Sequence, residues 1–407
     1  MFARAGHTGY VRNTMRFAPA AFLLSVVAAP AFGQAPPDVS VGFGVDTSNA
    51  DVAAIVRTVN AYFRIRGAGH SRTPLWSADE QKQLHDYDLT ADFVFQGFPA
   101  TIASVTTTEA RSSEYVVRTL FAHADSNGKN IRPVAMQRLY ASRAPDGTWV
   151  LGGALQRLTA GWLTRDVKFI TYHMPGSWRF DEQKADRAVH FIDSTAHALQ
   201  VPRPEHIDYY LTGSAEEMYR IIGLDYFVLP SGPVGSRGGK SFPHDRIVVS
   251  GDPELGEAYL HELAHVVIGV AYPEGARNTL LNEGFATWLG GSRERSFPQM
   301  MQALLDYQNA NPRVTFAALI DGDPAAGWHA EETDALYATG ALIFDVVNTH
   351  YGVWGIKKLL GLRGRPNRSV EPELKLMLEI TQSMDDWWRT ETLRAAARSR
   401  SALRTPQ

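Results

Sequence analysis

The sequence predicts an α+β protein in two parts: a small module of one helix and an antiparallel sheet, then a larger α+β domain that ends in helices. Three observations lead to this fold class. Apolar residues recur first at helical spacing, then in short β-rich runs between turns, and then in the order strand, helix, strand before a helical C-terminal part. The 407 residues are 44% hydrophobic, which allows two or three domains with cores of their own.

The charge and the residue content exclude several classes of function. The chain has 40 Lys and Arg against 43 Asp and Glu, so its net charge of -3 gives no basic surface for nucleic acid. It contains no cysteine, which excludes disulfide scaffolds, thiolate metal sites and thiol nucleophiles. Any metal ion must therefore be held by His, Asp or Glu.

Residues 1–33 are typical of a secretory signal peptide. Arg4, Arg12 and Arg16 precede an apolar run at residues 17–29, and small residues follow it. The run is shorter than the roughly 20 residues that a spanning helix needs, so a membrane anchor is the less favoured alternative. We therefore expect an exported protein, periplasmic or secreted, without a stable membrane anchor after cleavage.

Residues 46–160 are expected to form the small N-terminal module. Apolar side chains at helical spacing predict a helix at residues 51–66. The β-rich runs that follow lie at residues 114–124, 132–142 and 148–155. One helix before an antiparallel sheet resembles the cystatin-like and NTF2-like modules.

Residues 166–400 are expected to form the second domain. The predicted strands lie at residues 167–173, 207–212 and 246–250, with a helix at residues 181–199 between the first two. A glycine-rich stretch at residues 231–239 lacks the spacing of a phosphate-binding loop and is interpreted as a loop.

The C-terminal apolar positions predict helices that close the far side of this domain. Their side chains, including Trp354, Leu376, Trp387 and Trp388, are expected in the core.

A helix predicted at residues 255–271 carries the sequence H-E-L-A-H. His261 and His265 are four residues apart, so both imidazoles project from one face and can reach a single Zn²⁺ at about 2.0 to 2.1 Å. Glu262 points roughly 100° around the helix, where it can reach a water without ligating the metal. The alternative is that the two histidines only border the core.

A second predicted helix offers a third metal ligand, Glu283. It contains the sequence L-N-E-G-F-A, with Asn278 as a cap and Gly290 and Gly291 as a stop. The loop before it can turn the chain back so that Glu283 faces the two histidines. The alternative is a solvated glutamate on the helix surface.

The pair of motifs H-E-L-A-H and L-N-E-G-F-A resembles the gluzincin metallopeptidases, the aminopeptidase N group above all. The resemblance implies that Glu283 is the third zinc ligand. The 17 residues between His265 and Glu283 are one or two fewer than in that group, a spacing similar to the broader peptidase-MA-like set. The upstream strand at residues 246–250 lacks the G-x-M-E-N segment that grips a free amino terminus, so the resemblance does not extend to aminopeptidase specificity.

Downstream, Tyr337 and Gly340 resemble the Y-x-x-G stretch of the same enzymes, whose tyrosine hydrogen-bonds the tetrahedral intermediate. A phenol about 3 Å from the oxyanion would add to the positive charge of the metal. The alternative is a tyrosine that only packs its ring. Just before Tyr337 lie His329, Glu331, Glu332 and Asp334. The carboxylates are expected to be solvated at the start of a helix, and the alternative is that these residues line the cleft or orient an imidazole.

Together these motifs predict an exported zinc metallopeptidase that acts on a peptide or protein. Zinc held by His261, His265 and Glu283 would polarise the scissile carbonyl and acidify a water, and Glu262 would take the proton of that water. Two alternatives stay open: a catalytically silent binding protein on a peptidase fold, and a zinc hydrolase of a non-peptide bond.

Overall fold

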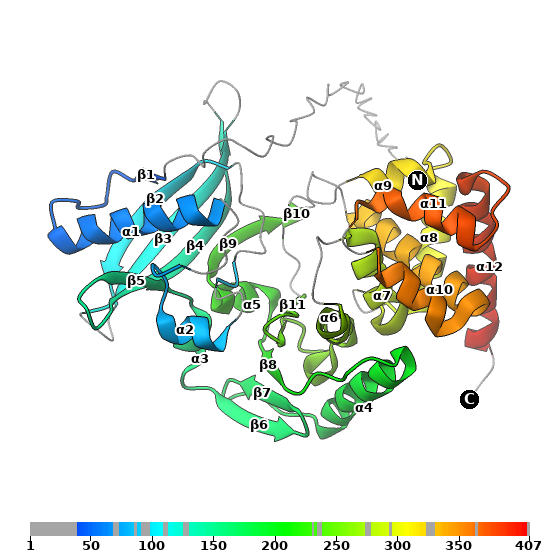
Figure 1. Cartoon of the computed structure of the whole chain (residues 1–407), viewed down its shortest axis with the longest axis horizontal. Coiled ribbons are helices and arrows are strands. Elements are labelled where there is room, and N and C mark those ends of the chain that lie inside the picture. Colours follow the sequence, from blue (N-terminus) through cyan, green and yellow to red (C-terminus); the bar gives the residue numbers. More distant parts are fainter. Residues whose placement is uncertain are drawn as a thin grey trace, which may run out of the picture. The chain divides into compact units, whose positions relative to one another are not determined.

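The computed structural model describes residues 39–67, 73–84, 88–90, 98–108, 113–124, 130–229, 232–233, 238–272, 278–292, 295–322, 330–362 and 365–404. The fold is α+β, as predicted (Figure 1). The predicted signal segment at residues 1–33 lies outside the described residues. None of the described helices is long and apolar enough to cross a membrane.

The N-terminal part contains the predicted helix and antiparallel strands. Helix α1 (Ala50–Gly67) buries Val52, Ile55 and Val59 in a core shared with residues of the sheet. The strands are β1 (Ser40–Val41), β2 (Ala100–Thr107), β3 (Tyr115–Ala124), β4 (Ile131–Arg143) and β5 (Trp149–Gly152). Two short helices, α2 (Ala78–Gln83) and α3 (Leu155–Thr159), complete this part.

This first sheet has the strand order β1-β2-β3-β4-β9-β10, and β5 also pairs with β4. Its pairings are antiparallel except the one between β1 and β2. Strands β9 (Leu224–Leu229) and β10 (Gly232–Pro233) come from beyond residue 166. The division into domains at residues 46–160 and 166–400 stays a prediction.

A second sheet has the order β11-β12-β8-β7-β6. Strands β7 (Ile170–Met174), β8 (Ile207–Leu211) and β12 (Ile247–Ser250) run parallel, and β6 (Leu163–Val167) and β11 (Gly239–Phe242) add antiparallel edges. Helix α4 (Glu182–Leu199), capped by Asp181, joins β7 to β8, and α5 (Ala215–Ile222) follows β8.

Two predictions for this second sheet were wrong. The strand expected at residues 167–173 is a hairpin of β6 and β7, because the chain turns at Lys168, whose φ is 57°. The glycine-rich stretch expected as a loop ends in strand β11, whose four residues pair with β12. Residues 231 and 234–237 of that stretch lie outside the described part.

The rest of the chain is helical. The helices are α6 (Leu260–Ala271), α7 (Thr279–Gly290), α8 (Phe297–Ala310), α9 (Phe316–Asp321), α10 (Ala330–Leu360), α11 (Val370–Met377) and α12 (Met384–Arg404). Trp387 and Trp388 are buried as predicted. Trp354 and Leu376 were wrongly expected in the core, since they are 60% and 73% exposed. Lys358 lies over the exposed Trp354 ring.

Helices α7 and α10 approach closely at two glycines. A Cβ on Gly284 would lie 2.5 Å from Cα of Gly340, so neither position can carry a side chain at this separation. Gly284 follows Glu283, and Gly340 lies three residues after Tyr337. This close crossing therefore sets where Glu283 and Tyr337 stand relative to each other.

Candidate metal centre

His261 and His265 lie on α6, at the start of which the predicted single helix is interrupted. Residues Gly256–Ala258 form a 3₁₀ turn, and Tyr259, with ψ of 80°, separates this turn from α6. The Tyr209 hydroxyl of β8 donates to the Gly256 carbonyl at 2.7 Å and accepts from the Tyr259 N–H at 3.0 Å. The sheet thus fixes the first turn of α6, where His261 and Glu262 stand.

Glu283 lies on α7, which begins and ends where the sequence predicts. The Asn278 side chain accepts a hydrogen bond from the Leu281 N–H at 3.0 Å. Gly291 ends the helix with φ of 75°, a conformation that favours glycine. Residues 273–277 between α6 and α7 lie outside the described part.

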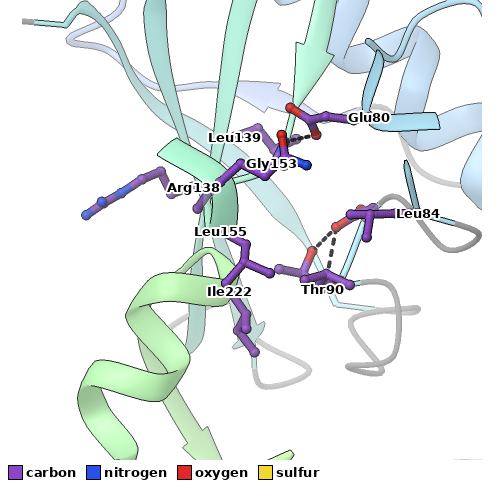
Figure 2. A pocket seen from close by; sticks show the side chains of 12 residues that line it. Glu80, Leu84, Thr90, Arg138, Leu139, Gly153, Leu155 and Ile222 are labelled. Atoms are coloured by element: carbon purple, nitrogen blue, oxygen red, sulfur yellow. Dashed lines mark hydrogen bonds between the residues drawn. The ribbon is translucent and has the colours of Figure 1, made fainter. Parts of the chain in front are cut away.

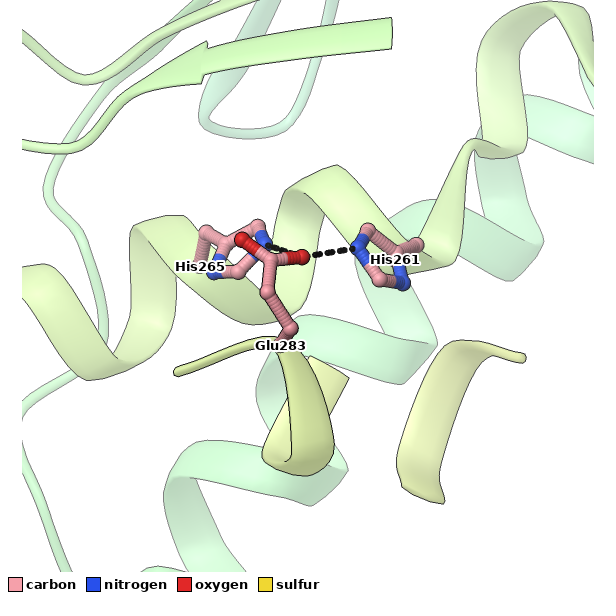
Figure 3. A group of neighbouring side chains, drawn as sticks. All are labelled: His261, His265 and Glu283. Atoms are coloured by element: carbon pink, nitrogen blue, oxygen red, sulfur yellow. Dashed lines mark hydrogen bonds and ion pairs between the residues drawn. The ribbon is translucent and has the colours of Figure 1, made fainter. Parts of the chain in front are cut away.

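The three side chains predicted as ligands converge (Figure 3). The Nε2 atoms of His261 and His265 lie 3.2 Å and 3.5 Å from Oε2 of Glu283. One ligand atom from each residue lies within 4.8 Å of the other two, and among the described residues only this group has the arrangement of a metal site. Glu283 is therefore not a solvated surface glutamate.

The hydrogen bonding of His261 leaves one of its two ring nitrogens available for a metal. Its other ring nitrogen, Nδ1, lies 2.7 Å from the carbonyl oxygen of Gly291. Since a carbonyl only accepts, Nδ1–H is the donor, and in the neutral ring Nε2 presents a lone pair toward Glu283. Two lone-pair atoms that face each other need a cation between them, either a proton on Nε2 or a metal ion.

The electrostatics of the group also favour a positive charge. Burial lowers the pKa of the His261 imidazole, but the hydrogen bond to Glu283 and the charges of Glu262 and Glu283 outweigh it, so that pKa is raised. Burial raises the pKa of the Glu283 carboxyl, but the charge of His265 and the hydrogen bonds to both imidazoles hold it well below its usual value. Two imidazoles and one carboxylate are a donor set that zinc sites with an open position use.

Glu262 follows His261 on α6 and is not one of the three converging ligand residues. It is buried, and the backbone of β11 passes beside it, because a Cβ on Gly239 would lie 2.7 Å from the Cγ of Glu262. Strand β11 therefore lies beside Glu262. Strand β11 carries no acidic residue.

Tyr337 lies beside His261. The two rings are nearly parallel, with an interplanar angle of 15° and 6.3 Å between centroids. The tyrosine is half-buried and packs against the large core. The structure brings it to the metal-binding group, while its role in hydrogen-bonding an intermediate stays a prediction.

The carboxylates before Tyr337 are not the solvated groups that were expected. Asp334 forms an ion pair with Arg295, and its side chain is 15% exposed. Glu332 is half-buried. His329 and the side chain of Glu331 lie outside the described part.

Sequence reasoning missed the second partner of His261. Gly291 was identified only as a helix stop, whereas its carbonyl also accepts the Nδ1–H hydrogen bond. Arg295 was not considered at all. A sequence signal for the carbonyl is weak, because every residue carries one, but a metal-binding histidine generally needs such a partner.

A second group of buried carboxylates lines a cavity of the N-terminal part (Figure 2). Glu80 binds Arg157, and its Oε2 accepts from the Gly153 N–H at 2.7 Å. Asp88 accepts from the Thr90 N–H at 3.0 Å. Arg138 extends away from Glu80 and Thr90 in Figure 2.

Comparison with known proteins gives likenesses among solved structures alone. No family model matches the chain, and no curated protein sequence matches it. Among solved structures, one match is a point mutant of an M1 zinc metallopeptidase from Deinococcus radiodurans, bound to a Tyr-Ser-Ala substrate. This chain is 15% identical to it, with a TM-score of 0.29, over 73% of this chain and 62% of that chain. The chain thus spans less than two thirds of that protein's length.

Proposed function

We propose that the protein is an exported zinc metallopeptidase of the gluzincin, peptidase-MA-like kind. The observation that carries the proposal is the convergence of His261, His265 and Glu283 from two helices, with ligand atoms within 4.8 Å of one another. The buried Glu262 in the same turn as His261 supports it. Export rests on the signal-like segment at residues 1–33.

The side chains of the site have distinct roles in this proposal. His261, His265 and Glu283 hold the ion, and a bound zinc ion supplies a Lewis acid that polarises the scissile carbonyl. Glu262 accepts the proton of the attacking water on its carboxylate and delivers it to the leaving amine. The Tyr337 hydroxyl donates a hydrogen bond to the oxyanion.

Two other functions share the same residues. A catalytically silent binding protein on this fold would have no need of a proton acceptor, whereas Glu262 is present beside the metal ligands. A zinc hydrolase of a non-peptide bond would use the same ion and the same glutamate. Only the substrate distinguishes this enzyme from a peptidase.

The test is cleavage profiling on a peptide library with the zinc-loaded chain from residue 34 onward. Wild-type protein should cleave a defined subset of peptides, and a zinc chelator should abolish the cleavage. The matched control is Glu262→Gln, which has nearly the same shape but cannot accept a proton. The peptidase assignment would be overturned if cleavage survived both the chelator and the Glu262→Gln substitution. It would also be overturned if the zinc-loaded wild type cleaved no peptide.

A further inference from the structure

Besides Glu283, the imidazole of His261 contacts the residue that follows α7 and a side chain of α10. Its Nδ1–H donates to the Gly291 carbonyl, which lies just after α7. Its ring lies parallel to that of Tyr337 on α10. Because both contacts reach one imidazole, the orientation of His261 depends on where Gly291 and Tyr337 stand relative to each other.

The Gly291 carbonyl belongs to a backbone segment, Gly291 and Ser292, that pairs with Arg295. Ser292 and Arg295 exchange two backbone hydrogen bonds, each 2.9 Å long. Gly291 and Arg295 also lie close together, since a Cβ on Gly291 would lie 2.3 Å from the Arg295 carbonyl oxygen. A displacement of Arg295 is therefore passed on to Gly291.

The side chain of Arg295 connects this backbone segment to α10. Its guanidinium pairs with Asp334, and the two side chains are 33% and 15% exposed. Asp334 lies three residues before Tyr337, so both side chains project from the same side of α10. The ion pair thus joins the backbone segment that carries the Gly291 carbonyl to the turn of α10 that carries Tyr337.

We propose that the Arg295–Asp334 ion pair is a positioning device for the metal centre. The ion pair keeps the Gly291 carbonyl and the Tyr337 ring in place against the His261 imidazole. It thereby raises the affinity of the site for zinc. Arg295 and Asp334 are positioning residues, since they act on the metal through His261. The inference rests on the proposed function, because it takes zinc to be the bound ion.

The test measures the zinc dissociation constant of the mature protein by competition with a chromogenic chelator. Arg295→Met and Asp334→Asn should each raise this constant by about tenfold or more, the effect of losing an outer partner of a metal-binding histidine. The double variant should match the single variants, because both remove the same interaction. Exchange of the charges, Arg295→Asp with Asp334→Arg, should restore part of the affinity.

The matched control is Arg398→Met. Arg398 pairs with Asp345 at 2.7 Å, so it also connects a neighbouring element to α10. Loss of a purely structural ion pair should lower the melting temperature without changing the zinc affinity, and this is the result expected for Arg398→Met. Asp334→Asn is nearly isosteric and carries the test if Arg295→Met does not fold.

Three outcomes would overturn the inference. An unchanged zinc dissociation constant in Asp334→Asn removes the positioning role. An equal increase in Arg398→Met shows that any loosening of α10 weakens the site. Wild-type protein that binds no zinc removes the proposed function, and this inference with it, so the two failures are distinguishable.

Discussion

The metal centre and the cavity of the N-terminal part both contain buried carboxylates, but the partners of these carboxylates differ. In the cavity, Glu80 faces a guanidinium and a backbone N–H, which are donors at every physiological pH. At the metal centre, Glu283 faces two imidazole nitrogens, which are donors only when protonated. A carboxylate with fixed donors stabilises the fold, whereas one that faces two imidazoles is arranged to receive a cation.

The largest effect should come from removing a metal ligand. His265→Ala or Glu283→Ala should lose most of the zinc and all detectable turnover, because two protein ligands do not hold the ion in an open site. Elemental analysis after dialysis measures the zinc content per chain. Normal zinc content in Glu283→Ala would show that another residue is the third ligand.

A matched control for the ligand variants is Asp208→Asn. Asp208 also lies near two imidazoles, at 2.7 Å from His173 and 3.4 Å from His206. These side chains are more exposed than the metal-binding group and lack its mutual spacing. Zinc content should therefore not change in Asp208→Asn.

Glu262→Gln should retain zinc and lose turnover. The glutamine does not accept a proton, so kcat should fall by about 10² to 10⁴, the usual contribution of a general base. Steady-state kinetics on a cleaved library peptide, with zinc content measured on the same sample, checks this. A near wild-type rate would remove Glu262 from the mechanism.

Arg157→Met should lower the stability of the fold and leave the zinc content unchanged, in contrast to the metal-ligand variants. It leaves Glu80 and Glu114 buried without their cation, which should cost about 3 to 5 kcal/mol in the free energy of unfolding. Denaturant unfolding measures this cost. Zinc loss in Arg157→Met at a temperature where it is folded would contradict the separation of the two regions.

The control for this variant is Arg143→Met. Arg157 pairs with carboxylates and lies over the Tyr140 ring. Arg143 likewise pairs with a carboxylate, that of Asp51, and lies over the Trp149 ring, but its side chain is 50% exposed. Exposed ion pairs contribute about 0 to 1 kcal/mol, so this variant should lose little stability. An equal loss in both variants would show that burial of the carboxylates is not the cause.

Tyr337→Phe should have the smallest effect on the rate. If the hydroxyl donates to the oxyanion, kcat should fall roughly ten- to a thousandfold, the scale of losing one such donor. KM, zinc content and unfolding should change little, because the interaction forms only in the transition state. An unchanged kcat would mean that the ring only packs against His261.

The sequence predicted the metal centre better than its surroundings. The spacing of His261 and His265 predicts their shared helix face, the resemblance of the two motifs implies Glu283, and the caps of α7 follow from Asn278 and Gly291. The spacing of the two histidines is local, so helix geometry alone places both imidazoles on one face. These are interactions that a single sequence records directly.

The surroundings depend on contacts between distant segments. The Arg295–Asp334 pair joins residues 39 positions apart, and nothing in either local sequence marks it. Strand β11 was missed because glycine and lysine are poor predictors of a strand, and it forms by pairing with β12. In both cases tertiary contacts decide the structure.

The most direct test of the metal centre is anomalous scattering at the zinc absorption edge, measured on crystals of the mature protein. We expect one strong peak at about 2.0 to 2.2 Å from Nε2 of His261, Nε2 of His265 and a carboxylate oxygen of Glu283. No peak at this position in zinc-loaded crystals, or a strong peak only at another cluster, would contradict the assignment of this group as the zinc site.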